Sequence, residues 1–245
     1  MATRRTLIAG NWKMHGLRRD LVWAVRFRAQ LAEPACEIVV CPPATLIGAL
    51  AETLSGSGAA LGGQDCAANA EEGAHTGDIS ARMLADLGCR YVIVGHSERR
   101  ETHHESDALV RAKAEAAISA GLVPIICVGE RLEEREAGKA EAVVLAQLAA
   151  SLPRVPAGEI VIAYEPVWAI GTGLNAGPDE AQAMHAAIRA ALGADTGERT
   201  RILYGGSVKP ANAADLLACP DVDGALVGGA SLDPEAFAQI VNLAS

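Results

Sequence analysis

Eight apolar runs recur along the chain at intervals of about 31 residues, the size of one strand–helix unit. The runs lack alternation of apolar and polar residues, as expected of strands that are covered on both faces. They begin near residues 6, 37, 59, 90, 122, 159, 201 and 224. Eight strands alternating with helices predict a (β/α)8 barrel with eight parallel strands. Eight units of about 31 residues account for nearly all 245 residues, so we expect one domain over residues 1–245.

Helix signals fill the intervals between the runs. Ser106 can cap a helix that Gly121 ends, and Pro178 and Pro234 stand at first helical positions. An open doubly wound sheet is the main alternative fold. The count of eight runs disfavours it, as does the lack of a Gly-x-Gly-x-x-Gly motif after the first run.

The charge balance limits the partners of the chain. With 30 acidic and 21 basic residues, the net charge of −9 argues against a general nucleic-acid binder and against an anionic membrane surface. An anionic ligand would therefore need a local positive charge.

Motifs for export, membrane insertion and metal binding are missing from the sequence. No apolar run approaches the roughly 18 residues of a membrane span, and the first run is too short for a signal peptide. We therefore expect a cytoplasmic protein. The six cysteines include no Cys-x-x-Cys pair, and no histidines lie at zinc spacing, so no metal site is predicted.

Polar residues follow the first and fourth runs, where a barrel of this type carries its reactive groups. Asn11 and Lys13 follow the first run. A lone lysine there is usually a solvated charge, but an anionic ligand would explain both residues. His96 follows the fourth run, either as a hydrogen-bonded structural group or as an electrophile or acid. Ser97 is expected to begin a helix, whose N-terminus would favour a neutral His96 ring.

A carboxylate and a long loop follow the sixth run. Glu165 is a candidate general base, although many carboxylates in this position only form ion pairs. The connection over residues 166–178 contains several glycines together with Val167, Trp168 and Ile170. Long loops of this kind tend to be lids, and apolar residues on a lid exclude water when it closes.

Two Gly-Gly turns follow the seventh and eighth runs. They are Gly205-Gly206-Ser207 and Gly228-Gly229. Tight turns need glycine in any case, but a pair on these two runs is typical of phosphate binding through backbone N–H groups.

Five segments together resemble the triosephosphate isomerase family, and they lie in the family's order along the whole chain. They are AGNWKM at 9–14, GHSERR at 95–100, AYEPVWAIGTG at 163–173, YGGSV at 204–208 and LVGGASL at 226–232. The resemblance implies the TIM barrel and the interconversion of dihydroxyacetone phosphate and D-glyceraldehyde 3-phosphate in glycolysis and gluconeogenesis. It implies neither a metal nor an organic cofactor.

The resemblance also implies roles for individual residues. Glu165 would be the base, His96 the electrophile, and Lys13 and Asn11 the electrostatic stabilisers, with Glu98 as their support. The substrate-binding residues would be Asn11, Lys13, Gly171, Ser207, Gly228 and Gly229.

A homodimer is implied as well, through the loop 64–78 with Thr76 reaching the neighbour. Two positions depart from the family's usual pattern: Leu174, where lysine is common, and Asp65, where asparagine is common. Two other functions stay open, a phosphate-binding barrel without catalysis and an aldolase of the same fold. An aldolase would need a Schiff-base lysine on a strand or a metal cluster, and the eight runs contain neither.

Overall fold

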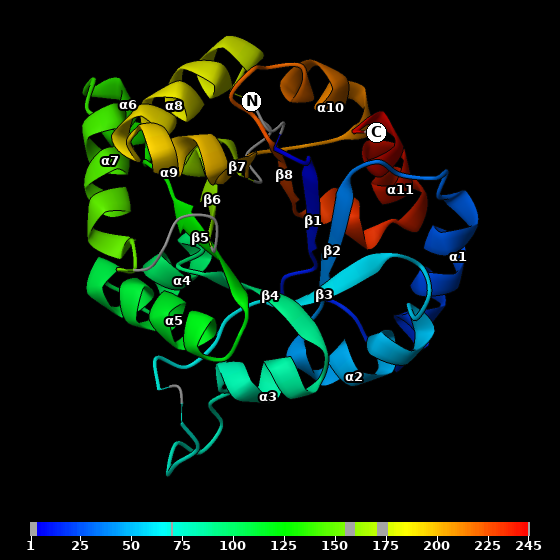
Figure 1. The fold of residues 1–245 in the computed structure, drawn as a ribbon. Coiled ribbons are helices and arrows are strands. Elements are labelled where there is room, and N and C mark those ends of the chain that lie inside the picture. The colour runs from blue at the N-terminus through cyan, green and yellow to red at the C-terminus, as the bar shows by residue number, and fades with distance from the viewer. Residues whose placement is uncertain (1–3, 70, 155–159, 171–175, 245) are drawn as a thin grey trace.

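The computed structural model describes residues 4–69, 71–154, 160–170 and 176–244 and contains a closed barrel of eight parallel strands (Figure 1). The strands are β1 (Leu7–Asn11), β2 (Glu37–Cys41), β3 (Ala59–Gly63), β4 (Cys89–Val94), β5 (Val123–Val128), β6 (Val161–Tyr164), β7 (Arg201–Tyr204) and β8 (Gly224–Val227). Each of the eight predicted runs forms one strand. β1 pairs with both β2 and β8, which closes the ring and excludes the open sheet.

Helices surround the barrel between successive strands (Figure 1). The α-helices are α1 (Val22–Gln30), α2 (Ala44–Thr53), α3 (Ala81–Asp86), α4 (Ser97–Thr102), α5 (Asp107–Ser119), α6 (Leu132–Glu136), α7 (Ala140–Ser151), α8 (Pro178–Ala191), α9 (Ala194–Arg199), α10 (Pro210–Leu217) and α11 (Pro234–Leu243). The 3-10 helices are η1 (Arg18–Leu21), η2 (Val167–Ala169) and η3 (Gly229–Leu232).

The predicted helix starts follow from local chemistry. The Ser106 side chain accepts from the Leu109 N–H at the start of α5, and the Asp233 side chain accepts from the first turn of α11. Pro178 is the first residue of α8, where its missing N–H leaves no helical hydrogen bond unmade. These caps set the points at which the chain turns back along the barrel.

The side chains of the strands divide between two cores with a period of two. Leu7 and Ala9 belong to a compact cluster inside the barrel, whereas Ile8 belongs to the larger cluster between the strands and the helices. The interior cluster also contains Tyr91 and Cys127, among others, all buried. The barrel is therefore a packed core, and open space is left for a ligand at its ends.

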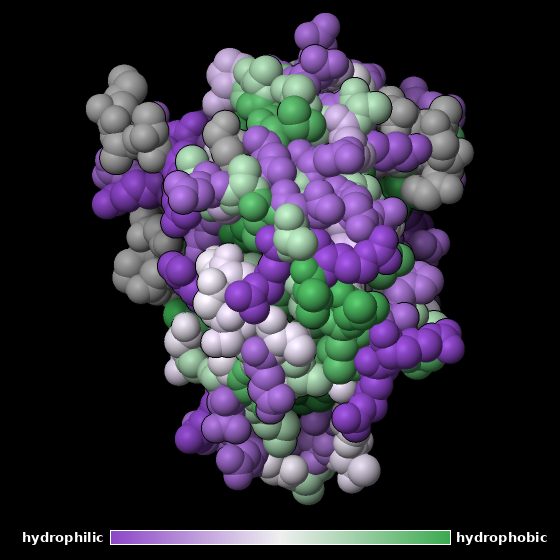
Figure 2. Space-filling view, turned by 90° about the vertical axis from the view of Figure 1, so that its right-hand side faces the viewer, coloured by the Kyte–Doolittle hydropathy of each residue, from purple (hydrophilic) through white to green (hydrophobic). Residues whose placement is uncertain are grey.

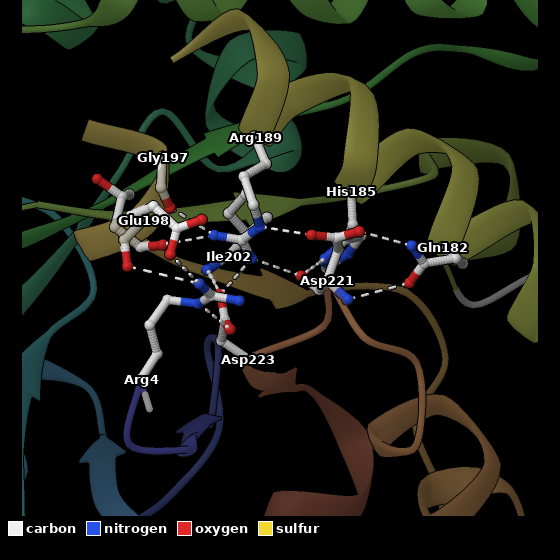
Figure 3. A network of polar contacts seen from close by, with 10 residues as sticks. Arg4, Gln182, His185, Arg189, Gly197, Glu198, Ile202, Asp221 and Asp223 are labelled. Atoms are coloured by element: carbon white, nitrogen blue, oxygen red, sulfur yellow. Dashed lines mark hydrogen bonds and ion pairs between the residues drawn. The ribbon is translucent and has the colours of Figure 1, made fainter. Parts of the chain in front are cut away.

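An ionic network fixes the N-terminal ends of neighbouring strands (Figure 3). Asp223, directly before β8, accepts from Arg189 of α8 at 2.7 Å and from Arg4 at 2.6 Å. The same carboxylate accepts from the Ile202 N–H of β7 at 2.8 Å. Because these partners come from distant parts of the chain, the network ties the closing strands to the helix that covers them.

The surface mixes charged and apolar side chains, as the face in Figure 2 shows. Among the exposed apolar residues are Met14 and Leu17, which follow β1. Within the described residues, no helix has both the length and the apolar character needed to cross a bilayer.

Candidate active site

A cavity of about 670 Å³ lies at the C-terminal ends of the strands. It is lined by all but one of the predicted site residues, namely Asn11, Lys13, His96, Glu165, Ser207, Gly228 and Gly229. The remaining one, Gly171, lies outside the described residues. Residues that are more than 200 positions apart in sequence thus meet at one mouth of the barrel, as the strand-end rule predicts.

Glu165 directly follows β6 and is only 1% exposed. One carboxylate oxygen, Oε2, accepts from the Ser97 N–H at 2.9 Å. The other, Oε1, lies 2.9 Å from Nε2 of His96. The carboxylate is thus held between the start of α4 and Nε2 of His96.

Opposing effects act on the pKa of Glu165. Burial raises it, whereas the neighbouring His96, the Ser97 N–H and Lys13 lower it, and the net shift is downward. Burial alone would raise the pKa of Glu165 and make it a stronger base. In the ligand-free structure the pKa is instead lowered, because polar partners surround the carboxylate. At neutral pH the group is ionised and able to accept a proton.

The imidazole of His96 is 5% exposed and caps α4. Burial lowers its pKa, but the carboxylate of Glu165 and, less strongly, that of Glu98 give a net rise. This shift opposes the neutral state predicted from the sequence. The Glu98 N–H, however, donates to Nδ1 at 3.2 Å, and that bond needs a lone pair that an imidazolium lacks. We therefore assign a neutral ring with its proton on Nε2, toward Glu165.

Lys13 has a left-handed backbone, with φ of 53°. Such a conformation is unfavourable for a residue with a side chain and persists only where its surroundings hold it. Its N–H donates to Asn11 Oδ1 at 3.0 Å, and its carbonyl accepts from Gln64 Nε2 at 2.8 Å. The Nζ atom donates to Glu98 Oε1 at 2.6 Å, so Glu98 occupies the supporting position expected of it. Together these contacts aim the ammonium group along the cavity wall.

The two Gly-Gly turns bring backbone close to the reactive groups. A Cβ at Gly228 would lie 3.5 Å from Lys13 Cε, so the lysine stem passes directly over that turn. A Cβ at Gly205 would lie 2.9 Å from Glu165 Cγ, so a side chain there would displace the carboxylate. Among the described residues, the N–H groups of Ser207 and Gly228 donate to no protein acceptor. A bound anion could therefore accept hydrogen bonds from these two N–H groups.

Two residues of this region, Gln64 and Lys209, were not predicted from the sequence. Gln64 follows β3 and bridges the carbonyls of Lys13 and Cys41, at 2.8 and 2.9 Å. Lys209 lines the cavity after β7 and adds a second cation to its mouth. The strand-end rule that identified Glu165 also applies to Gln64, whereas Lys209 lies too far past its strand for that rule.

Comparisons with known proteins agree over almost the whole chain. The triosephosphate isomerase family profile matches residues 6–244. The chain is 57% identical to the triosephosphate isomerase of Acidiphilium cryptum, covering 98% of both chains. It is 53% identical to that of Thermus thermophilus, covering 98% of this chain and 99% of the relative. The crystal structure of triosephosphate isomerase from Bartonella henselae superposes with a TM-score of 0.90 at 46% identity, covering 98% of both chains. The chain therefore belongs to the triosephosphate isomerase family of isomerases.

Proposed function

We propose that this protein interconverts dihydroxyacetone phosphate and D-glyceraldehyde 3-phosphate by proton transfer through an enediolate. The observation that carries the proposal is the meeting of Glu165, His96 and Lys13 at one cavity. A base, a neutral N–H donor and a cation are what proton abstraction next to a carbonyl requires.

Glu165 acts as the base and His96 as the electrophile. The carboxylate takes a proton from the carbon next to the carbonyl, and the electron pair of that C–H bond moves into the carbon–carbon bond. The carbonyl π pair moves onto oxygen, where His96 Nε2–H and Asn11 stabilise the charge. His96 then gives its Nε2 proton to that oxygen and takes the hydroxyl proton from the oxygen on the neighbouring carbon, which moves the negative charge to the second oxygen. Finally Glu165 returns its proton to the former carbonyl carbon, and the second oxygen forms the new carbonyl. In the ligand-free structure, Nε2 of His96 lies 2.9 Å from the Glu165 carboxylate. A bound substrate replaces the carboxylate as the partner of Nε2, and the carboxylate is then free to approach the substrate carbon.

The substrate phosphate binds at Lys13 and the glycine turns, that is at Gly171, Ser207, Gly228 and Gly229. The N–H groups of Ser207 and Gly228, which have no acceptor in the described part of the chain, support this role, as does the lysine stem above Gly228. Positive potential is thus gathered at one mouth of a chain whose net charge is −9.

The segment 166–178 acts as the lid over the reaction. A lid holds the phosphate and keeps water from the enediolate, which could otherwise expel phosphate by cleavage of its C–O bond. The lining of the cavity by Ile170 supports this role, since the residue comes from the described flank of the segment.

The protein works as a homodimer through loop 64–78, with Thr76 reaching the neighbour's Asn11 region. In Figure 1 this loop extends away from the barrel between β3 and α3, and Thr76 is exposed. Met14, beside the cavity residue Lys13, is 95% exposed and offers an apolar contact for a second copy. One catalytic domain over residues 1–245 and a cytoplasmic location stay predictions.

A coupled assay with D-glyceraldehyde 3-phosphate tests the proposed function. The folded protein should turn the substrate over, and Lys13→Met should weaken substrate binding by about tenfold to a hundredfold, since charge-assisted hydrogen bonds contribute roughly 1.5–3 kcal/mol. The alternative is a phosphate-binding barrel without catalysis. Calorimetric binding of inorganic phosphate by a folded protein that shows no turnover would favour that alternative.

A further inference from the structure

Arg135, near the end of α6, extends its side chain between two segments that are separated by five residues in sequence. One is the flank 166–170, which follows Glu165, and the other is the flank 176–180, which enters α8. The side chain is 28% exposed, and each part of its guanidinium has a different partner. None of these partners belongs to α6 itself.

The first flank is held through Trp168 and Glu130. The guanidinium carbon of Arg135 lies 4.7 Å from the centroid of the Trp168 ring, a cation–π contact. The indole N–H donates to Glu130 Oε1 at 2.8 Å, and the Tyr164 hydroxyl donates to the same oxygen at 3.1 Å. Arg135 Nη1 lies 3.5 Å from that oxygen. Glu130 is fully buried, so the arginine also supplies a counter-charge to a buried carboxylate.

The second flank is held through Glu180. Arg135 Nη2 donates to Glu180 Oε1 in a short ion pair. The other oxygen of Glu180 accepts from the Gly177 N–H at 2.9 Å, which closes the capping box of α8. The arginine is thereby connected to the first residue ahead of that helix.

The geometry requires a planar guanidinium. Its central carbon lies over the Trp168 ring, while its two terminal nitrogens lie next to Glu130 and Glu180. A lysine ammonium is a single point charge and cannot make all three contacts together.

We propose that Arg135 is a positioning residue that couples the two flanks, so that the segment after Glu165 is set at both ends by one side chain. This inference rests on the proposed function in one respect, because its consequence for catalysis assumes that the segment covers the substrate. Its structural part, the coupling of the flanks, does not depend on catalysis.

Hydrogen exchange of the backbone amides in the ligand-free protein tests the coupling directly. Arg135→Met keeps apolar contact with Trp168 and removes the cation, and exchange should rise about fivefold to tenfold in both flanks, which corresponds to about 1 to 1.4 kcal/mol. Arg135→Lys should restore part of the protection. Glu180→Gln should raise exchange mainly in the flank 176–180. Arg131→Met, at the exposed start of α6, is the matched control and should leave both flanks unchanged.

Kinetics provide the second readout. In Arg135→Met, the ratio of released inorganic phosphate to isomerised product should rise by a similar fivefold to tenfold, while the melting temperature stays near that of Arg131→Met. Unchanged exchange, or a rise in one flank alone, would overturn the coupling. Lower thermal stability with an unchanged phosphate ratio would reduce Arg135 to a structural role. An inactive wild-type protein would contradict the proposed function, and the exchange result would still decide the coupling.

Discussion

His185 in α8 is fully buried, and the fold disfavours the protonated form of its ring. The ring packs between Tyr164 and Tyr204, at centroid distances of 5.9 and 6.3 Å. Nδ1 lies 3.2 Å from the Asp221 carbonyl, which assigns its proton to that nitrogen (Figure 3). Nε2 is buried without an acceptor among the described residues, so a second proton there would be uncompensated.

Burial therefore lowers the pKa of His185 to about 4, even though Asp221 and Asp223 act to raise it. Above pH 6.5 the ring is neutral in both the folded and the unfolded protein, and the shift has no effect. Between pH 6.5 and 4 only the unfolded chain takes up the proton, so stability falls as the pH falls. The full loss is about 3.4 kcal/mol, of which about 2 kcal/mol is reached by pH 5.

Urea unfolding at pH 7.5 and pH 5.0 measures this loss. His185→Gln keeps an N–H donor for the Asp221 carbonyl but cannot titrate, so its stability should fall by about 2 kcal/mol less than that of the wild type. His103→Gln, at an exposed position, is the matched control and should follow the wild type. An equal pH dependence in wild type and His185→Gln would refute the reasoning.

Two further predictions concern packing and charge beside the site. In Gly129→Ala the new Cβ would overlap the Glu165 carbonyl oxygen, so the base should shift and kcat should fall about a hundredfold, measured beside a stability loss of about 1–3 kcal/mol. The buried Lys113 donates hydrogen bonds to the carboxylates of both Asp65 and Glu105. Burial raises the pKa of Asp65. For Glu105, the contacts with Lys113 and Arg99 outweigh burial and lower the pKa. Thermal unfolding at pH 7 should therefore show a loss of about 3 kcal/mol for Glu105→Gln and none for Asp65→Asn. A destabilised Asp65→Asn would contradict this assignment.

The barrel and the members of its site could be predicted because their signals are local. Each strand is a short apolar run, and each helix start has its own cap, as at Ser106 and Asp233. The strand-end rule then places Asn11, Lys13 and Glu165 at one mouth without knowledge of any distance.

The contacts that hold those residues could not be predicted, because they depend on side-chain directions between distant segments. Gln64 supports the strained backbone of Lys13 from another strand, and Arg135 reaches two flanks that follow it by more than 30 residues. The pKa of Glu165 shows the same limit. Its burial could be expected from the strand, but the Ser97 and His96 contacts that reverse the shift follow only from the packed structure.

Turnover by Glu165→Asp tests the central claim most directly. The shorter side chain keeps the charge but withdraws the carboxylate by one methylene from the substrate carbon, and a displacement of about 1 Å can lower the rate roughly a hundredfold. The account predicts a fall in kcat of at least about that size in the coupled assay, with far-ultraviolet circular dichroism and melting temperature close to those of the wild type. Wild-type kcat in a folded Glu165→Asp protein would contradict the assignment of Glu165 as the base.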